Sequence, residues 1–139
     1  MRRKGTYVIV FTLDAGTEVR VGALGTFFFE PGMYCYVGSA MGGLDQRVQR
    51  HLRRDKVLKW HIDYLTTIAS CSRAYVSYPD PIPECQLGTM ASDAGMEPTV
   101  RGFGCSDCDC HTHLFRADGS SVRRLVDTAG LVRYPDILG

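Results

Sequence analysis

Residues 6–37 consist of β-branched and aromatic segments separated by turn sequences, and this pattern constrains the fold more than any other feature. Residues 6–13 (TYVIVFTL) predict a first strand, and a turn joins it to residues 18–25 (EVRVGALG) as a hairpin. Two further aromatic strand segments flank a tight turn at residues 30–32, and the second of them ends at Gly38. The first part of the chain is therefore expected to form a sheet.

The periodicity changes at residue 44. Leu44, Val48 and Leu52 recur at the spacing of one face of an amphipathic helix. Three more helices are predicted: one around residues 60–68, one from Pro83 to residue 92, and a last one at 120–130 that is capped by Ser and closed by Gly130. Two short strands are predicted between them, at 71–78 and 111–117. Because strands come first, helices follow and strands return, the sequence predicts an α+β fold, with a small mixed, mainly antiparallel sheet flanked by helices.

Length and composition fit one domain. The chain has 139 residues, 45% of them hydrophobic, so we expect a single core and a single domain over residues 1–139. Asp14 ends the first apolar run too early for a signal peptide, and no apolar stretch approaches the roughly 20 residues that span a bilayer. We therefore expect a cytoplasmic protein with no membrane contact, whose six cysteines are reduced thiols or metal ligands.

Positive charge is concentrated after residue 44, although the formal net charge is only +1. On a helix, Arg47, Arg50 and Arg54 would form one stripe, and His51 would lie one turn from Arg47 beside the apolar face. Such a segment is either a solvated surface or a site for a polyanion. The sequence GSAMGG just before it favours the second interpretation, because small residues and a helix N-terminus let a phosphate approach the backbone.

Four elements of the sequence occur in an informative order. GTY at residues 5–7 lies on the first strand, YVG at residues 36–38 lies on a later strand, Arg47 follows on the helix, and Glu84 begins a later helix. In this order they resemble the GIY-YIG nuclease superfamily. The segments GSAMGGLDQRVQRHL, WHIDYL and GFGCSDCDCHTHL more closely resemble an uncharacterised, largely archaeal family regarded as related to those nucleases.

The resemblance implies a GIY-YIG-like core that performs metal-dependent hydrolysis of phosphodiesters in nucleic acid, with DNA as the expected partner and repair or processing as the context. It implies Tyr7 as the general base, Tyr36 as the residue that positions the water, Arg47 as the phosphate ligand and Glu84 as the ligand of Mg²⁺ or Mn²⁺. His51 is an alternative base or relay, because a histidine titrates near neutral pH. The residues expected to bind nucleic acid are Ser39, Arg50, Arg53, Arg54 and Lys56.

Three features differ from the nucleases that the chain resembles. The hairpin of residues 18–32 is an insertion, Ser39 and Ala40 stand where many relatives carry a lysine, and the chain contains no asparagine. These differences leave open a second function, that of a catalytically inactive nucleic-acid-binding module.

The sequence CSDCDCHTH at residues 105–113 gathers thiol and imidazole groups. Zinc is a candidate cofactor here, although a structural zinc site commonly joins two separate ligand pairs and no distant C-x-x-C is present. The alternative is that the cysteines are small buried apolar side chains. A zinc- or thiol-dependent protein centred on this segment is therefore a third candidate function. The residues proposed for a second polar site are His61, Asp63, Cys108, Cys110 and His113.

Overall fold

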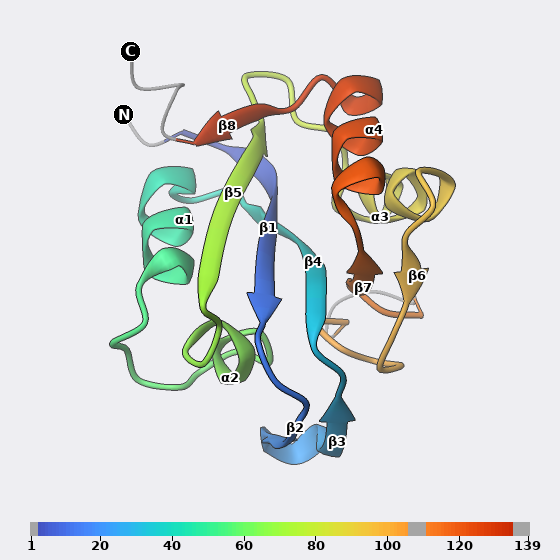
Figure 1. Ribbon diagram of the computed structural model, residues 1–139. Helices are drawn as coiled ribbons and strands as arrows, with labels where there is room; N and C mark the ends of the chain where they lie inside the picture. The colour runs from blue at the N-terminus through green and yellow to red at the C-terminus, as the bar shows by residue number, and fades with distance from the viewer. Residues whose placement is uncertain (1–2, 106–110, 135–139) are drawn as a thin grey trace.

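A six-stranded antiparallel sheet forms the centre of the computed structural model, which describes residues 3–105 and 111–134 (Figure 1). The strands lie in the order β6-β7-β4-β1-β5-β8, and every pairing between them is antiparallel. The bounds of these strands are β1 (Gly5–Leu13), β4 (Gly32–Ala40), β5 (Cys71–Ser77), β6 (Glu97–Pro98), β7 (Leu114–Ala117) and β8 (Val132–Tyr134). The predicted α+β class is confirmed, and the described sheet is antiparallel throughout, not mixed.

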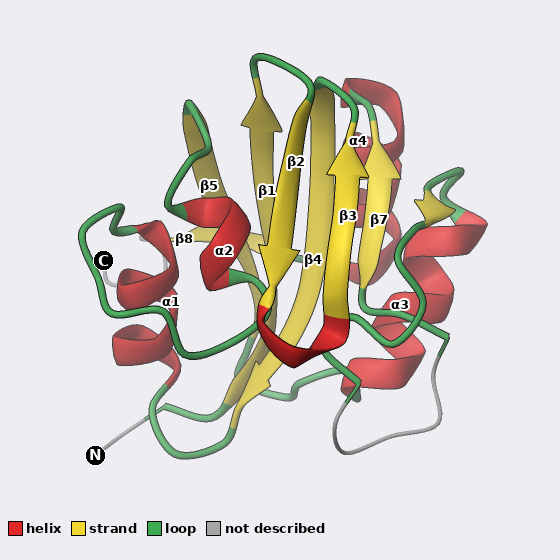
Figure 2. Ribbon diagram, turned by 90° about the horizontal axis from the view of Figure 1, so that it is seen from below, coloured by secondary structure: helices red, strands yellow, loops and turns green. Residues whose placement is uncertain are grey.

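Helices cover both faces of the sheet (Figures 1 and 2). Their bounds are α1 (Leu44–Leu52), α2 (Asp63–Thr66), α3 (Glu84–Asp93) and α4 (Gly119–Ala129). The first two pack into one hydrophobic core and the last two into another. None of the helices within residues 3–105 and 111–134 is long and apolar enough to cross a membrane.

The central position of β1 explains its nearly continuous apolar sequence. Ile9 and Phe11 point into the core beneath α1 and α2, whereas Val8 and Val10 point into the core beneath α3 and α4. Since successive side chains of a strand face opposite sides, a strand covered on both faces needs apolar residues at every position.

The predicted hairpin between residues 6–13 and 18–25 is wrong. β1 pairs with β4 and β5, whereas β2 (Thr17–Val21) pairs with β3 (Gly25–Phe29) around a short 3-10 turn. β2 alternates between half-buried and exposed positions and is fully buried only at Val21, so it suits a hairpin with one covered face and not the fully buried centre of the sheet. The β2–β3 hairpin is therefore inserted in the chain between β1 and β4 and is not part of their sheet. Figure 2 shows it in front of the sheet.

Helix ends also differ from the expectation. α1 ends at Leu52, because Arg53 is extended and the Lys56 ammonium donates to the carbonyl oxygens of Arg50 and His51. Arg54 consequently lies outside the helix and its predicted stripe. α4 is capped by Asp118 and not by a serine, although Gly130 closes the helix in the left-handed conformation as expected.

Leu44→Ala should lower the free energy of unfolding by about 2–5 kcal/mol, because Leu44 is fully buried where α1 meets β1. Leu58→Ala is the matched control, since Leu58 is 46% exposed and its truncation should change stability by less than about 0.5 kcal/mol. Urea unfolding followed by circular dichroism measures both. Equal effects of the two substitutions would contradict the placement of α1.

Candidate functional site

A buried hydrogen bond joins the first strand to the basic helix. The Tyr7 hydroxyl lies 2.7 Å from Nε2 of His51, and the two side chains are only 2% and 1% exposed. Gly38 lies directly across from Tyr7 on β4, and a Cβ atom at this position would come within 2.5 Å of the Tyr7 hydroxyl oxygen. The glycine of the YVG sequence therefore makes room for the tyrosine of the GTY sequence.

Aromatic rings surround His51 on its other sides. The Tyr36 ring centroid lies 6.1 Å from that of His51, and the Trp60 centroid lies 5.7 Å from it. Tyr36 is only 9% exposed and also packs edge-on against Phe103 at 6.0 Å. The structure thus brings Tyr7, Tyr36 and His51 together, as expected for residues of one site.

Burial keeps these three groups neutral. It raises the pKa of Tyr7 far above its ordinary value, with Arg47 opposing the shift, and it raises the pKa of Tyr36 in the same way. Burial also lowers the pKa of His51 to about 3, and the neighbouring Lys56 charge acts in the same direction. Near neutral pH the centre of the site is therefore a phenol hydrogen-bonded to an uncharged imidazole.

Arg47 and Glu84 add opposite charges from opposite layers of the fold. Arg47 donates to the Ser39 carbonyl oxygen at 3.1 Å, and its guanidinium lies 4.5 Å from the centre of the Trp60 ring. The Glu84 side chain is 28% exposed and its carboxylate lies 3.7 Å from Nδ1 of His113. Arg47 lowers and Glu84 raises the pKa of Tyr7, so both charges act on the same hydroxyl.

The buried carboxylate of Asp63 organises the segment after α1, a role that the sequence did not indicate. Asp63 is 0% exposed and accepts two hydrogen bonds from Arg50, at 2.8 and 2.9 Å. The backbone N–H groups of Lys59 and Trp60 each donate to it at 2.9 Å. Burial favours a raised pKa for Asp63, but these hydrogen bonds prevail and lower it.

Two of the predicted nucleic-acid ligands have internal partners. The side chain of Lys56 is 2% exposed and donates to Thr66 Oγ1 at 2.8 Å as well as to the end of α1, and burial lowers its pKa to about 8. Arg50 binds Asp63 and the Val57 carbonyl oxygen. Arg53 and Arg54 are exposed, so the geometry favours these two for contact with a polyanion.

The members of the predicted second polar site have separate partners. His61 Nδ1 accepts a hydrogen bond from the Gly104 N–H at 3.0 Å, Asp63 binds Arg50, and His113 lies beside Glu84. Cys108 and Cys110 lie outside the described residues, so a zinc site at the cysteine cluster stays a prediction. Among residues 3–105 and 111–134, no three Cys, His, Asp or Glu residues are grouped so that they could hold a metal ion.

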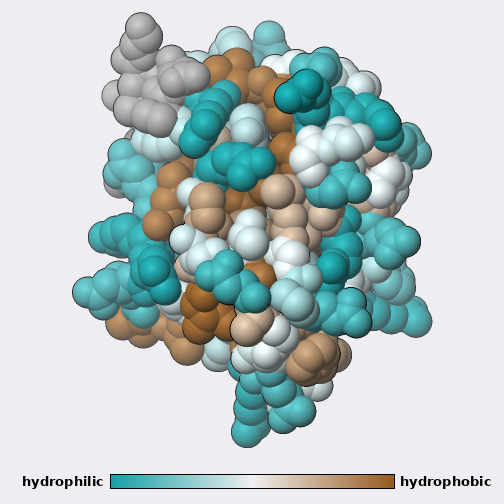
Figure 3. All heavy atoms as spheres, viewed as in Figure 1, coloured by the Kyte–Doolittle hydropathy of each residue, from teal (hydrophilic) through white to brown (hydrophobic). Residues whose placement is uncertain are grey.

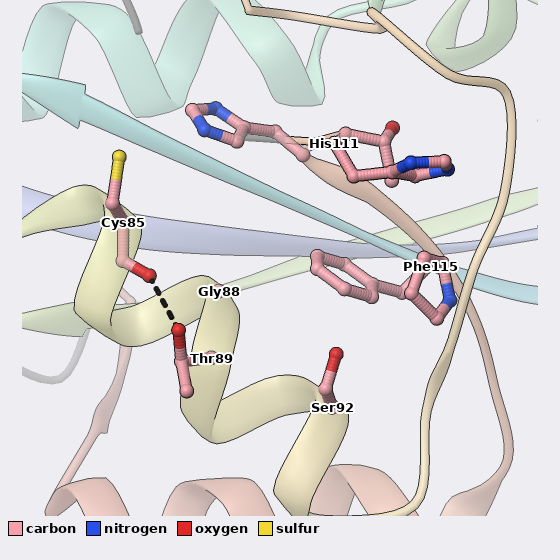
Figure 4. A pocket seen from close by; sticks show the side chains of 9 residues that line it. Cys85, Gly88, Thr89, Ser92, His111 and Phe115 are labelled. Carbon is pink, nitrogen blue, oxygen red and sulfur yellow. Dashed lines mark hydrogen bonds between the residues drawn. The ribbon is translucent and has the colours of Figure 1, made fainter. Parts of the chain in front are cut away.

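A small open pocket lies between α3 and the segment that leads into β7 (Figure 4). Its volume is about 210 Å³, and the Thr89 hydroxyl beside it is already bonded to the Cys85 carbonyl oxygen. The residues that line it are Cys85, Gly88, Thr89, Ser92, Pro98, His111, Thr112, His113 and Phe115. His113 is the member that links this pocket to Glu84.

A comparison with known protein families gives a match over residues 6–131. This region contains every residue of the candidate site. The chain belongs to the family described as domain of unknown function DUF123. No curated protein and no solved structure matches it significantly. Membership of DUF123 confirms the expected uncharacterised family and carries no activity, so the relation to GIY-YIG nucleases stays a prediction.

Asp63→Asn should destabilise the protein by about 3 kcal/mol, because it leaves the largely buried charges of Arg50 and Lys56 without their carboxylate. Asp55→Asn is the control in the same segment, since Asp55 is exposed. Chemical denaturation of both variants measures the difference. Similar stabilities for the two would contradict the anchoring role of Asp63.

The stability of the protein should fall as the pH decreases from 6.5 towards the folded-state His51 pKa of about 3. Within this window the unfolded chain protonates His51 and the folded chain does not, so His51 contributes a slope of about 1.4 kcal/mol per pH unit. Above pH 6.5 the histidine is neutral in both states and contributes no slope.

His51→Gln should flatten this dependence by that amount, because glutamine does not titrate. The control is His111→Gln, at an exposed position. Urea unfolding at a series of pH values gives the slopes, and an unchanged slope in His51→Gln would contradict the buried neutral state.

Proposed function

We propose that this DUF123 protein is a metal-dependent nuclease of the GIY-YIG type that hydrolyses phosphodiester bonds, with DNA as the expected substrate. The observation that supports it most is the 2.7 Å contact between Tyr7 and His51, with the charges of Arg47 and Glu84 acting on the same hydroxyl. Phosphodiester hydrolysis needs an activated water, a cation for the developing oxyanion and a ligand for a metal, and these residues offer all three.

The neutral pair of Tyr7 and His51 favours a proton relay over a tyrosinate base. In the tautomer of His51 in which Nε2 accepts from the Tyr7 hydroxyl, the Tyr7 oxygen keeps a lone pair for a proton of the attacking water. As the water oxygen bonds to phosphorus and the bond from phosphorus to the leaving oxygen breaks, the water proton passes to Tyr7 and the Tyr7 proton passes to His51, which becomes an imidazolium. This route avoids a free phenolate, which burial makes unfavourable, and the negative charge of the bound phosphate must offset the cost that the same burial puts on the imidazolium of His51.

Arg47 is the phosphate ligand in this mechanism. Stacking on Trp60 and one hydrogen bond to the Ser39 carbonyl oxygen hold its guanidinium, which has five N–H donors in total. A guanidinium held in this way can present its remaining donors to phosphate oxygens without further ordering.

Glu84 suits Mg²⁺ or Mn²⁺. Its partly exposed carboxylate is a hard oxygen ligand, and Mg²⁺ is commonly held by one or two carboxylates together with substrate phosphate and water. A divalent cation bound there would stabilise the negative charge on the leaving oxygen. His113, buried beside Glu84, is placed to orient the carboxylate.

Nucleic-acid binding without cleavage is the second candidate function. It is favoured by the burial of the two tyrosines, which are 2% and 9% exposed, whereas Arg47 and Glu84 are partly exposed. The charged residues are therefore the first members of the site that a phosphate would meet.

Tyr7→Phe and Glu84→Gln should each reduce cleavage of labelled single-stranded, duplex or branched DNA in Mg²⁺ or Mn²⁺ by about 10²-fold or more. Binding measured by fluorescence anisotropy in the same samples should change little, because neither substitution removes a positively charged side chain. Matched controls are Tyr75→Phe, on β5 in the opposite core, and Glu97→Gln, which is exposed.

Full cleavage by Tyr7→Phe would contradict the relay. Salt-sensitive binding by every protein with cleavage by none would favour the binding module, and absence of both would exclude the two candidate functions together.

A further inference from the structure

The loop between α1 and α2, residues 53–60, exposes apolar and cationic side chains together. Val57 is 84% exposed and Leu58 is 46% exposed. Arg53, Arg54 and Lys59 are exposed around them, and Asp55 is the one exposed acidic residue of this loop. Figure 3 shows apolar atoms among hydrophilic ones at the lower left, where this loop lies in Figure 1.

The exposure of Val57 and Leu58 is built into the loop. The Val57 carbonyl oxygen accepts a hydrogen bond from Arg50 at 2.8 Å, and the Lys59 N–H donates to buried Asp63 at 2.9 Å. Both ends of the Val57-Leu58 pair are thus tied to the same Arg50–Asp63 ion pair. Two aliphatic side chains held in water by a fixed backbone are costly to expose, and they gain free energy when a partner covers them.

The loop is continuous with the phosphate site. The Lys59 ammonium lies 4.9 Å and the Arg47 guanidinium 4.5 Å from the centre of the same Trp60 ring. A phosphate chain bound at Arg47 therefore meets the cations of the loop next. This continuity favours a nucleic acid over an apolar protein surface as the partner.

We propose that Val57 and Leu58 form an apolar wedge that contacts unstacked bases of the bound nucleic acid, while Arg53, Arg54 and Lys59 hold the flanking phosphates. Base faces are the apolar part of a nucleic acid, and inserted aliphatic side chains unstack base steps in other proteins. The wedge rests on the proposed function, because it needs a nucleic acid at Arg47. The wedge implies that the bound nucleic acid is locally unstacked at the site of cleavage.

The test compares two double variants on DNA that carries 2-aminopurine, a base whose fluorescence rises on unstacking. Val57→Ser/Leu58→Ser should abolish the fluorescence rise and weaken binding roughly tenfold at every salt concentration, because it removes apolar contact only. Arg53→Gln/Arg54→Gln should instead flatten the dependence of log affinity on log salt by roughly 0.9 for each lost phosphate contact. Ile68→Ser, at a residue 46% exposed outside the loop, is the control and should change neither quantity.

The outcomes separate the wedge from the function on which it rests. Unchanged fluorescence and affinity in Val57→Ser/Leu58→Ser, with weakened binding in Arg53→Gln/Arg54→Gln, would overturn the wedge and leave nucleic-acid binding in place. Absence of DNA binding by the wild type at any salt concentration would overturn both. Binding to phosphatidylserine vesicles that requires Val57 and Leu58, without DNA binding, would assign the loop to an anionic membrane surface and also overturn the wedge.

Discussion

The pairing of β1 with β4 is the contact on which the candidate site depends. The two strands pair from Gly5 opposite Ala40 to Leu13 opposite Gly32, and this register places Tyr7 opposite Gly38. A shift by one residue would turn Tyr7 into the other core, because successive side chains of a strand face opposite sides. The same pairing fixes where α1 begins, since the Leu44 N–H donates to the Arg3 carbonyl oxygen beside the start of β1.

The Arg50–Asp63 ion pair has a different role, which is to give the basic segment its shape. Removing a carboxylate from water is unfavourable, and the hydrogen bonds that Asp63 accepts offset that cost only in this geometry. The ion pair divides the cations of the segment into two groups. Arg50 and Lys56 support the backbone, whereas Arg53 and Arg54 remain exposed to solvent.

The chemistry proposed for the site follows from the burial of Tyr7 and His51. In the resting site the buried Tyr7 and His51 are hydrogen-bonded and both neutral, and this favours a relay over a resident tyrosinate base. Partial exposure of Arg47 and Glu84 keeps the charges where a phosphate and a cation would arrive. The same burial limits the access of water to Tyr7. A nuclease needs that access, whereas a binding module does not.

The sequence by itself determined which segments become β1, α1 and α3, because β-branched composition, apolar periodicity and a proline at a helix start are local signals that tertiary packing did not override. The resemblance in the order of its motifs also singled out Tyr7, Tyr36, Arg47 and Glu84, and the helical spacing added His51. The structure places Tyr7, Tyr36 and His51 in contact, and the charges of Arg47 and Glu84 both act on the pKa of Tyr7. Only the tertiary structure decided the strand partners, the end of α1 and the burial of Asp63. These depend on long-range contacts: β2 and β4 are both plausible neighbours of β1 by composition, and a carboxylate in a basic segment reveals its partner only when Arg50 folds against it.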